Sequence, residues 1–352
     1  MKKLLLLAMA LVGTMLAHAQ DSETRSATLQ SGETTTVFSG ADAFKNALEA
    51  AEDGSIITLS SGNFNGTGIF VKSVKVYGAG FQDDEKTGVK CTNVLGDVNV
   101  RGNENNENKY PNGLYFEGVW FTDGVNIQNS NASAVMTGLQ FVKCRTGGFD
   151  FYGNTNSTLL LQSFIEGPLH GHDRTASNLL VQNCIVTQHV GSFGGASDVL
   201  VDHCMLTRDN AGAYDQYHGP YRFRSTLVNC YLPGGATEEY CFGAKWYVTG
   251  AGMRTGGYYL GEDFESWATF FKDGQNDLSY TIKETGAPRT WELAEPDKFV
   301  GEDGTPVGVA GGEYPWNPIP STPRIVSSSI DSKSVAGKLK VNIKAEARPV
   351  NK

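Results

Sequence analysis

The chain has 352 residues, of which 40% are hydrophobic and 19% are charged, and its formal net charge at pH 7 is −9. The lysines and arginines form no cluster, so the charge pattern excludes nucleic acid and anionic membrane surfaces as partners. After the first twenty residues, no apolar stretch approaches the ~20 residues that a membrane-spanning helix needs. The sequence therefore predicts no membrane span.

Residues 1–19 have the pattern of a signal peptide. Lys2 and Lys3 precede an apolar run over 4–16, and residues 17–19 form a small-x-small cleavage site. We expect the mature protein to be exported, whether it is secreted, periplasmic or held at the cell surface. Loss of the two lysines changes the formal charge from −9 to −11, and an acidic exported chain is better suited to neutral glycans than to polyuronates.

A polar leader over 20–36 precedes a short amphipathic helix predicted over 41–52. The apolar residues of its one face are Phe44, Ala47, Leu48 and Ala51. Ser39 and Asp42 have the spacing of a capping box. Such a helix suits the end of a stack of strands, because an open end exposes apolar side chains and unpaired strand edges.

Six segments between residues 114 and 232 repeat one pattern of core positions. In each segment these positions, almost all of them apolar, are spaced by two, three and two residues, which is strand alternation broken once by a corner. The segments begin at Leu114, Leu139, Leu159, Leu179, Val199 and Ser225. The repeat predicts an all-β fold, a single-stranded right-handed parallel β-helix with one coil per ~20–26 residues.

One residue occupies the corner of each coil. In chain order the corner residues are Gly118, Lys143, Ser163, Asn183, His203 and Asn229. Glycine and asparagine suit a corner with positive φ, and stacked side chains there can hydrogen-bond along the ladder. Cys144, Cys184, Cys204 and Cys230 follow the corners and are predicted to be free, buried thiols. Cys91 and Cys241 lie outside this register.

The C-terminal part differs in composition and lacks the regular repeat. Residues 240–316 hold four of the five tryptophans, and we expect irregular aromatic-rich coils over 236–326. A proline-rich run over 314–323 is predicted to be extended. Alternating residues over 338–347 predict a final strand whose lysines blunt the edge of the stack. Residues 37–352 are therefore read as one elongated, monomeric β-helix.

Several motifs together resemble one known family. They are the helix over 41–52, the strand Ile56–Leu59 with Gly62, the turn Val76–Gly80 and the later coils. Over residues 37–232 the chain resembles the pectate-lyase-like right-handed β-helix superfamily. That resemblance implies the fold and an active site on one outer strand face. It leaves the activity open, because the superfamily includes lyases, hydrolases, esterases, epimerases and non-catalytic surface proteins.

Five histidines lie within 49 residues of the predicted mature chain, at His170, His172, His189, His203 and His218. Asp150 and Tyr152 have the same offsets in their coil as His170 and His172, and His189 and Asp209 follow in the next coils. The pattern predicts a stripe of Asp and His on one outer face, suited to acid–base chemistry. Alternatively its carboxylates could hold Ca²⁺, or the stripe could be a solvated surface. His203 is read as a structural corner residue.

Further candidates surround the stripe. Arg174 and Arg222 are candidate cations for a uronide carboxylate, and Tyr217, His218, Tyr258 and Trp316 are candidate sugar-binding residues. The Arg-x-Pro-x-x-Arg arrangement of pectate lyases is absent, and Asp150 and Asp209 are too far apart for a hydrolase pair. The sequence predicts a polysaccharide lyase or hydrolase, with a non-catalytic glycan-binding or adhesin-like protein as the alternative. Ca²⁺ is the cofactor suggested, and the histidines lack a recognisable Zn²⁺ spacing.

Overall fold

The computed structural model describes residues 25–84, 88–102, 110–129, 134–207 and 267–323, except 278, 282–284 and 286. It also gives the backbone of the strands between 221 and 259 and of two strands near the C-terminus. The predicted signal peptide lies outside the described residues. Within the described part of the chain, no helix has the length and apolar character needed to cross a bilayer.

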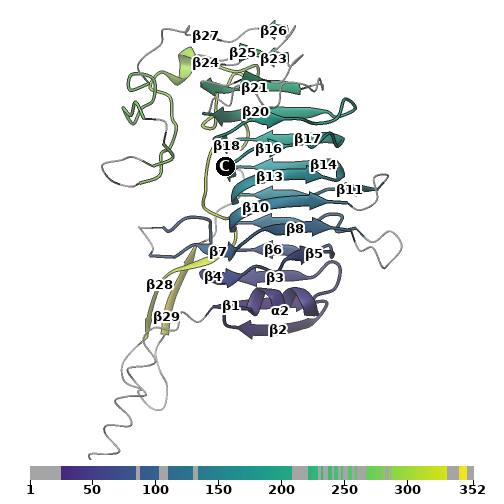
Figure 1. The fold of residues 1–352 in the computed structure, drawn as a ribbon. Helices are drawn as coiled ribbons and strands as arrows, with labels where there is room; N and C mark the ends of the chain where they lie inside the picture. Colours follow the sequence, from purple (N-terminus) through teal and green to yellow (C-terminus); the bar gives the residue numbers. More distant parts are fainter. Residues whose placement is uncertain are drawn as a thin grey trace, which may run out of the picture.

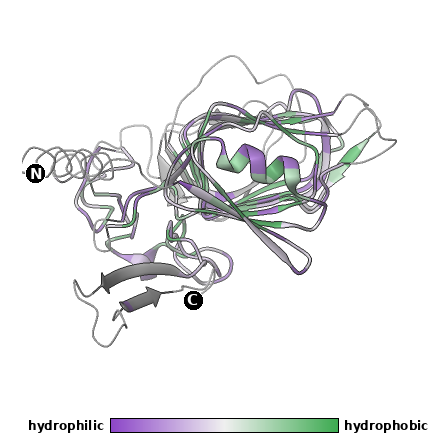
Figure 2. Ribbon diagram, turned by 90° about the horizontal axis from the view of Figure 1, so that it is seen from below, coloured by the Kyte–Doolittle hydropathy of each residue, from purple (hydrophilic) through white to green (hydrophobic). Residues whose placement is uncertain are grey.

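The N-terminal end of the stack is closed by a hairpin and a helix. Strands β1 (Ser26–Ser31) and β2 (Thr34–Ser39) pair antiparallel, and β1 also pairs antiparallel with β3 (Ile56–Leu59). The leader expected over 20–36 is therefore β-structure from residue 26 onward. Helix α2 (Ala43–Ala50) buries Phe44 and its neighbours and lies across the end of the coil (Figure 2), as the amphipathic pattern predicted.

The predicted capping box is not formed. Asp42 is the N-cap residue of α2, but its side chain makes no capping bond. Its Oδ1 instead accepts a hydrogen bond from Nδ2 of Asn65 at 2.8 Å. The carboxylate therefore ties the start of the helix to β4 (Gly62–Asn65), the second strand of the first coil.

After this cap the chain winds into a β-solenoid of parallel ladders (Figure 1). The first ladder contains β3, β6 (Lys75–Tyr77), β9 (Tyr115–Glu117), β12 (Gln140–Val142), the ends of β14 (Asn154–Leu161) and β17 (Ala176–Gln182), the starts of β20 (Val199–Leu206) and β21 (Tyr221–Val228), β23 (Thr237–Glu239) and β26 (Met253–Thr255). This confirms the all-β solenoid with one capping helix. The right-handed sense of the coil stays a prediction.

Two more ladders form the other sides. The second contains β4, β7 (Thr92–Leu95), the starts of β10 (Trp120–Gln128) and β13 (Arg145–Tyr152), β15 (Phe164–Ile165), β18 (Ile185–Val186), the ends of β20 and β21, β24 (Phe242–Ala244) and β27 (Tyr258–Tyr259). The third contains β5 (Ile69–Phe70), β8 (Val98–Arg101), the ends of β10 and β13, β16 (Leu169–His170) and β19 (Val190–Gly191). Strand β11 (Val135–Thr137) pairs with the start of β14, and β22 (Tyr231–Leu232) with β25 (Tyr247–Val248).

Small side chains stack inside the coil just after the corner. The backbone N–H of Cys144 donates to Oγ of Ser163, that of Ser163 to Sγ of Cys184, and that of Cys184 to Sγ of Cys204. The column continues to Ser225, whose Oγ accepts from the N–H of Cys204 at 3.2 Å. The three cysteines are free and fully buried, as predicted; Cys230 and Cys241 lie outside the described residues.

The predicted register is wrong by one residue in the third segment. Leu161 pairs with Val142, so Thr158 and Leu160 point inward, and the positive φ falls on Gln162 rather than on Ser163. The inward Ser163 donates its hydroxyl to backbone carbonyls of Phe141 and Leu161, which an apolar count does not detect. In the last segment Tyr221 pairs with Val199, so the match that began at Ser225 is wrong as well.

Residues 267–323 form an outer layer instead of further coils. Trp267, Phe270, Phe271 and Trp291 form a second core that packs against the outward face of the second ladder, including Phe164. A short 3₁₀ helix, η1 (Pro296–Lys298), lies in this layer. Strands β28 (Arg324–Ile330) and β29 (Val341–Glu346) pair antiparallel in a sheet of their own, so the final strand does not blunt the edge of the solenoid.

A segment over 301–321, here called the strap, runs back along the column of corners (Figure 1). Corner side chains bind it in reverse order: Asn183 Nδ2 donates to the carbonyls of Val309 and Gly311, Gln162 Nε2 to that of Pro315, and Lys143 Nζ to that of Ile319. The corner side chains were expected to bond along their own ladder. They bond to the strap instead, whose backbone carbonyls lie beside the corners and accept from their side-chain N–H groups.

Candidate functional site

A groove with a volume of about 660 Å³ crosses the outward face of the third ladder. The residues that line it come from the loops and strands around β8, β10 and β13, together with Pro168. Its polar and aromatic lining residues are Asp97, Asp123, Asn126, Gln128, Asp150 and Tyr152. Because alternate residues of a strand face outward, these side chains stand in columns across successive coils.

At one end of this groove, Asp150 lies beside two histidines. Asp150 pairs in register with His170 on the next coil, and the Oδ1 of Asp150 is 3.8 Å from Nδ1 of His170. The same Oδ1 is 2.6 Å from Nε2 of His172. We call these three residues the Asp–His cluster. All three side chains are 15–28% exposed, so they are partly desolvated and still reachable from solvent.

The local backbone holds His172 in this position. His172 and Asp173 have φ values of 45° and 59°, in a left-handed turn that few residues other than glycine adopt but in which Asp and His are enriched. The N–H of Arg174 closes the turn on the carbonyl of Gly171. The ring of Tyr152 stacks on that of His172 with centroids 4.0 Å apart. The turn and the stacked ring together aim the imidazole at Asp150.

Burial keeps two of the histidines neutral near pH 7. It lowers the pKa of His170 below its ordinary value of 6.5, helped by repulsion from His172 and opposed by Asp150 and Asp173. It lowers the pKa of His189 to about 4, with His170 adding to the shift. The rings of His170 and His189 meet edge to face at 5.6 Å. Neutral imidazoles can accept a proton or ligate a metal ion.

The structure brings most of the predicted stripe together. Asp150, His170, His172 and His189 share one region, although Gly191, not His189, is the partner of His170 in the ladder. The turns before β16 and β19 are equally long, and the offset comes from the register error in the third segment, since Phe164 pairs with Ile185 and not with Cys184. Asp209 lies outside the described residues, so its place in the stripe stays a prediction.

The other candidates are not gathered at the groove. Arg174 is exposed in the turn after the cluster. Arg222 pairs with Leu200 on the first ladder and Tyr258 with Phe242 on the second, which are other sides of the coil. Trp316, predicted to bind sugar, is half-buried in the outer layer against Phe81 and Tyr280. Tyr217 and His218 lie outside the described residues.

Sequence reasoning missed the carboxylates and amides from the earlier coils. Asp97 accepts a bond from the N–H of Gly124, and Asn99 accepts bonds from the side-chain amides of Asn126 and Gln128. The feature that could have revealed these side chains is the in-register pairing of β8, β10 and β13. It was hidden because these coils are longer than the 20-residue repeat on which the alignment rested.

The Asp–His cluster can also hold a metal ion. One ligand atom from each of its three residues lies within 4.8 Å of the others. Two imidazole nitrogens and one carboxylate oxygen are a ligand set found in metal sites with open positions. The cluster therefore supports either proton transfer or metal binding.

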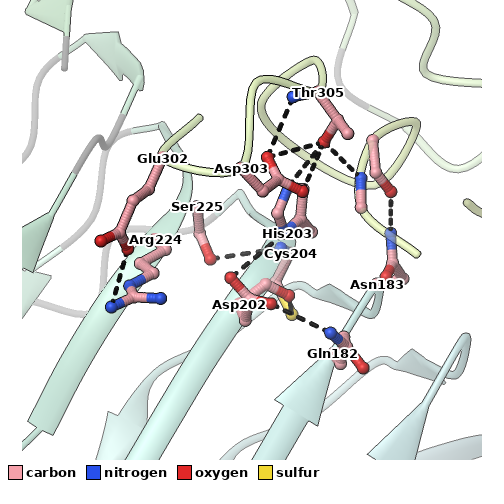
Figure 3. A network of polar contacts seen from close by, with 12 residues as sticks. Gln182, Asn183, Asp202, His203, Cys204, Arg224, Ser225, Glu302, Asp303 and Thr305 are labelled. Atoms are coloured by element: carbon pink, nitrogen blue, oxygen red, sulfur yellow. Dashed lines mark hydrogen bonds and ion pairs between the residues drawn. The ribbon is translucent and has the colours of Figure 1, made fainter. Parts of the chain in front are cut away.

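His203 lies at a second polar centre, at the upper end of the strap (Figure 3). Its Nδ1 is 3.1 Å from Oδ1 of Asp202, and its Nε2 is 3.1 Å from Oγ1 of Thr305 and 3.5 Å from Oδ2 of Asp303. Hydrogen bonding and charge from Asp202, with a smaller contribution from Asp303, raise the pKa of His203 above 6.5 against the effect of burial. These partners fix the strap to its corner, consistent with a structural role for His203.

No family model, curated protein or solved structure matches the chain.

Proposed function

We propose that this protein is an exported polysaccharide-processing β-helix related to the pectate-lyase-like superfamily, and that it hydrolyses a glycan bound in the groove. The observation that carries the proposal is the Asp–His cluster at the end of a polar groove that crosses several coils. A rigid parallel sheet holds such side chains in fixed relation, as catalysis requires.

The lining of the groove suits a chain of sugars. Asn126 and Gln128 are amides that can donate to and accept from hydroxyl groups. Tyr152, which is 41% exposed, offers an aromatic face beside the cluster. The columns repeat at roughly 4.8 Å per coil, so a linear polymer lying across the coils would meet similar groups at each one.

The charge of the groove favours a neutral glycan and hydrolysis. Asp97, Asp123 and Asp150 all line it, and a polyuronate would be repelled by them. Hydrolysis commonly uses two carboxylates about 5–10 Å apart. Asp123 and Asp150 lie on neighbouring coils and line the same groove, so Asp123 replaces the distant Asp209 as the second carboxylate.

The test is incubation of the mature protein with neutral and uronic polysaccharides, measuring new reducing ends and the absorbance of unsaturated uronides. We expect reducing ends from a neutral glycan without absorbance, and loss of the signal in Asp150→Asn. The matched control is Asp297→Asn, which alters an exposed carboxylate in the outer layer and should change nothing. Absorbance would show a lyase and overturn hydrolysis. Binding without cleavage would leave the glycan-binding alternative, and no binding would overturn both.

A further inference from the structure

The Asp–His cluster has the donor atoms of a metal site. Its ligand atoms are Oδ1 of Asp150, Nδ1 of His170 and Nε2 of His172, with separations of 3.8 and 2.6 Å from the shared carboxylate oxygen. Ligands 2.0–2.2 Å from a Zn²⁺-sized ion in tetrahedral or octahedral geometry lie roughly 3 Å from one another. The two observed separations bracket that value, so small side-chain rotations suffice to admit an ion.

We propose that Asp150, His170 and His172 bind one divalent first-row transition metal ion, of the Zn²⁺ class, with its remaining coordination positions open to the groove. The inference rests on the proposed function for the location of the reaction centre. It adds that Asp150 acts there as a ligand of a bound ion and not as one of two free carboxylates, and a site with only three protein ligands leaves room for water or substrate.

The fold presents the three ligands without help from an ion. Parallel register sets His170 beside Asp150, one coil apart. The left-handed turn at His172 and Asp173 brings the third ligand back over the same point. Neighbouring rings limit the rotation of the two imidazoles, since Tyr152 stacks on His172 and His189 meets His170 edge to face. Such packing around ligands orients metal sites in proteins.

The donor set selects the class of ion. Ca²⁺ and Mg²⁺ prefer oxygen ligands, whereas two imidazoles and one carboxylate suit zinc, manganese, iron, cobalt or nickel. This argument replaces the Ca²⁺ suggested by the sequence. Asp97 and Asp123 line the same groove, and their negative charge raises the local concentration of cations.

The experiment uses the mature chain without an affinity tag, stripped of metal with a chelator and titrated with Zn²⁺ by calorimetry and with Co²⁺ by visible absorption. We expect one equivalent bound, and a loss of affinity of more than about 100-fold in His170→Gln and in His172→Gln, beyond the 10–100-fold typical of residues that only orient ligands. The control His203→Gln removes a histidine outside the cluster and should leave the affinity unchanged.

Each variant is checked for its β-sheet circular dichroism before titration. A folded protein that binds no equivalent of either ion overturns the inference, as does an affinity that the cluster substitutions leave unchanged. Metal binding is measured without substrate, so failure of the metal proposal can be distinguished from failure of the proposed hydrolysis. Stoichiometric metal with no cleavage of any glycan would count against the proposed hydrolysis alone, and cleavage by metal-free protein would count against the ion alone.

Discussion

Replacement of His203 by glutamine should loosen the strap in a pH-dependent way. His203 contacts Asp202 and Thr305, and its charged form also faces Asp303. Arg224 and Glu302 form an ion pair at 2.9 Å beside it. Glutamine is a suitable replacement, because Gln162 already occupies a corner with φ of 47° and binds the strap through its amide.

The sign of the pH effect follows from the raised pKa of His203. A raised folded-state pKa means that protonated His203 stabilises the strap fully below its ordinary pKa of 6.5. This contribution is lost as the pH rises through the folded-state value. Asp202, whose pKa is lowered by His203, stays ionised at mildly acidic pH and keeps the charged partner in place.

A hydrogen bond to a charged group contributes about 1.5–3 kcal/mol, so strap opening in His203→Gln should increase by about 10- to 150-fold at about pH 5.5 and by much less at about pH 9. Amide hydrogen exchange, corrected for intrinsic rates, measures this at the N–H groups of Val307, Gly311 and Trp316, which are bonded within the outer layer. Asn183→Ala is the control, because its strap bonds do not titrate. Equal effects of His203→Gln at both pH values would refute the charge-based reasoning.

Three further predictions concern the two cores. Arg289→Met should cost about 3 kcal/mol in urea unfolding followed by tryptophan fluorescence, since it removes a fully buried guanidinium and strands the carboxylate of Asp273, which is only 12% exposed; the double variant with Asp273→Leu should recover most of the loss, and no recovery would argue against the pair. Phe141→Ala should cost about 3–5 kcal/mol, with a lower thermal midpoint, because a fully buried ring is removed. Burial raises the pKa of Cys144 to about 12, so alkylation at about pH 8 should modify it only after unfolding, and labelling of the native protein, detected by mass spectrometry, would contradict its place in the core.

The sequence predicted the core of the solenoid correctly wherever the inward residues are apolar. Val181 and Val201 alternate with outward residues in coils of equal length, so the period of two and the repeat agree. The prediction failed at Ser163, because a small hydroxyl can be buried when it bonds to backbone, as Ser163 does with the carbonyl of Leu161. Burial there depends on hydrogen bonding, which hydrophobicity does not report.

The candidate site was predictable in part for the same reason. Asp150 and His170 share an offset in successive coils, so their approach follows from the register, whereas His172 reaches Asp150 through the left-handed turn. Asp123 was missed because the longer coils around it break the repeat. The strap was missed because it binds the corner side chains through its own backbone carbonyls, more than 100 residues away, as in the bond from Asn183 to Val309, and carbonyls carry no sequence signature.

The strap also restricts how the protein can change in length. A plain β-solenoid can gain or lose a coil with little effect on its neighbours, since each coil contacts only the next. Here the corners at Lys143, Gln162, Asn183 and His203 each meet a different point of one continuous segment. An extra coil among them would displace every later contact by roughly 4.8 Å, so coil duplication during evolution or design should be tolerated only outside the region that the strap spans.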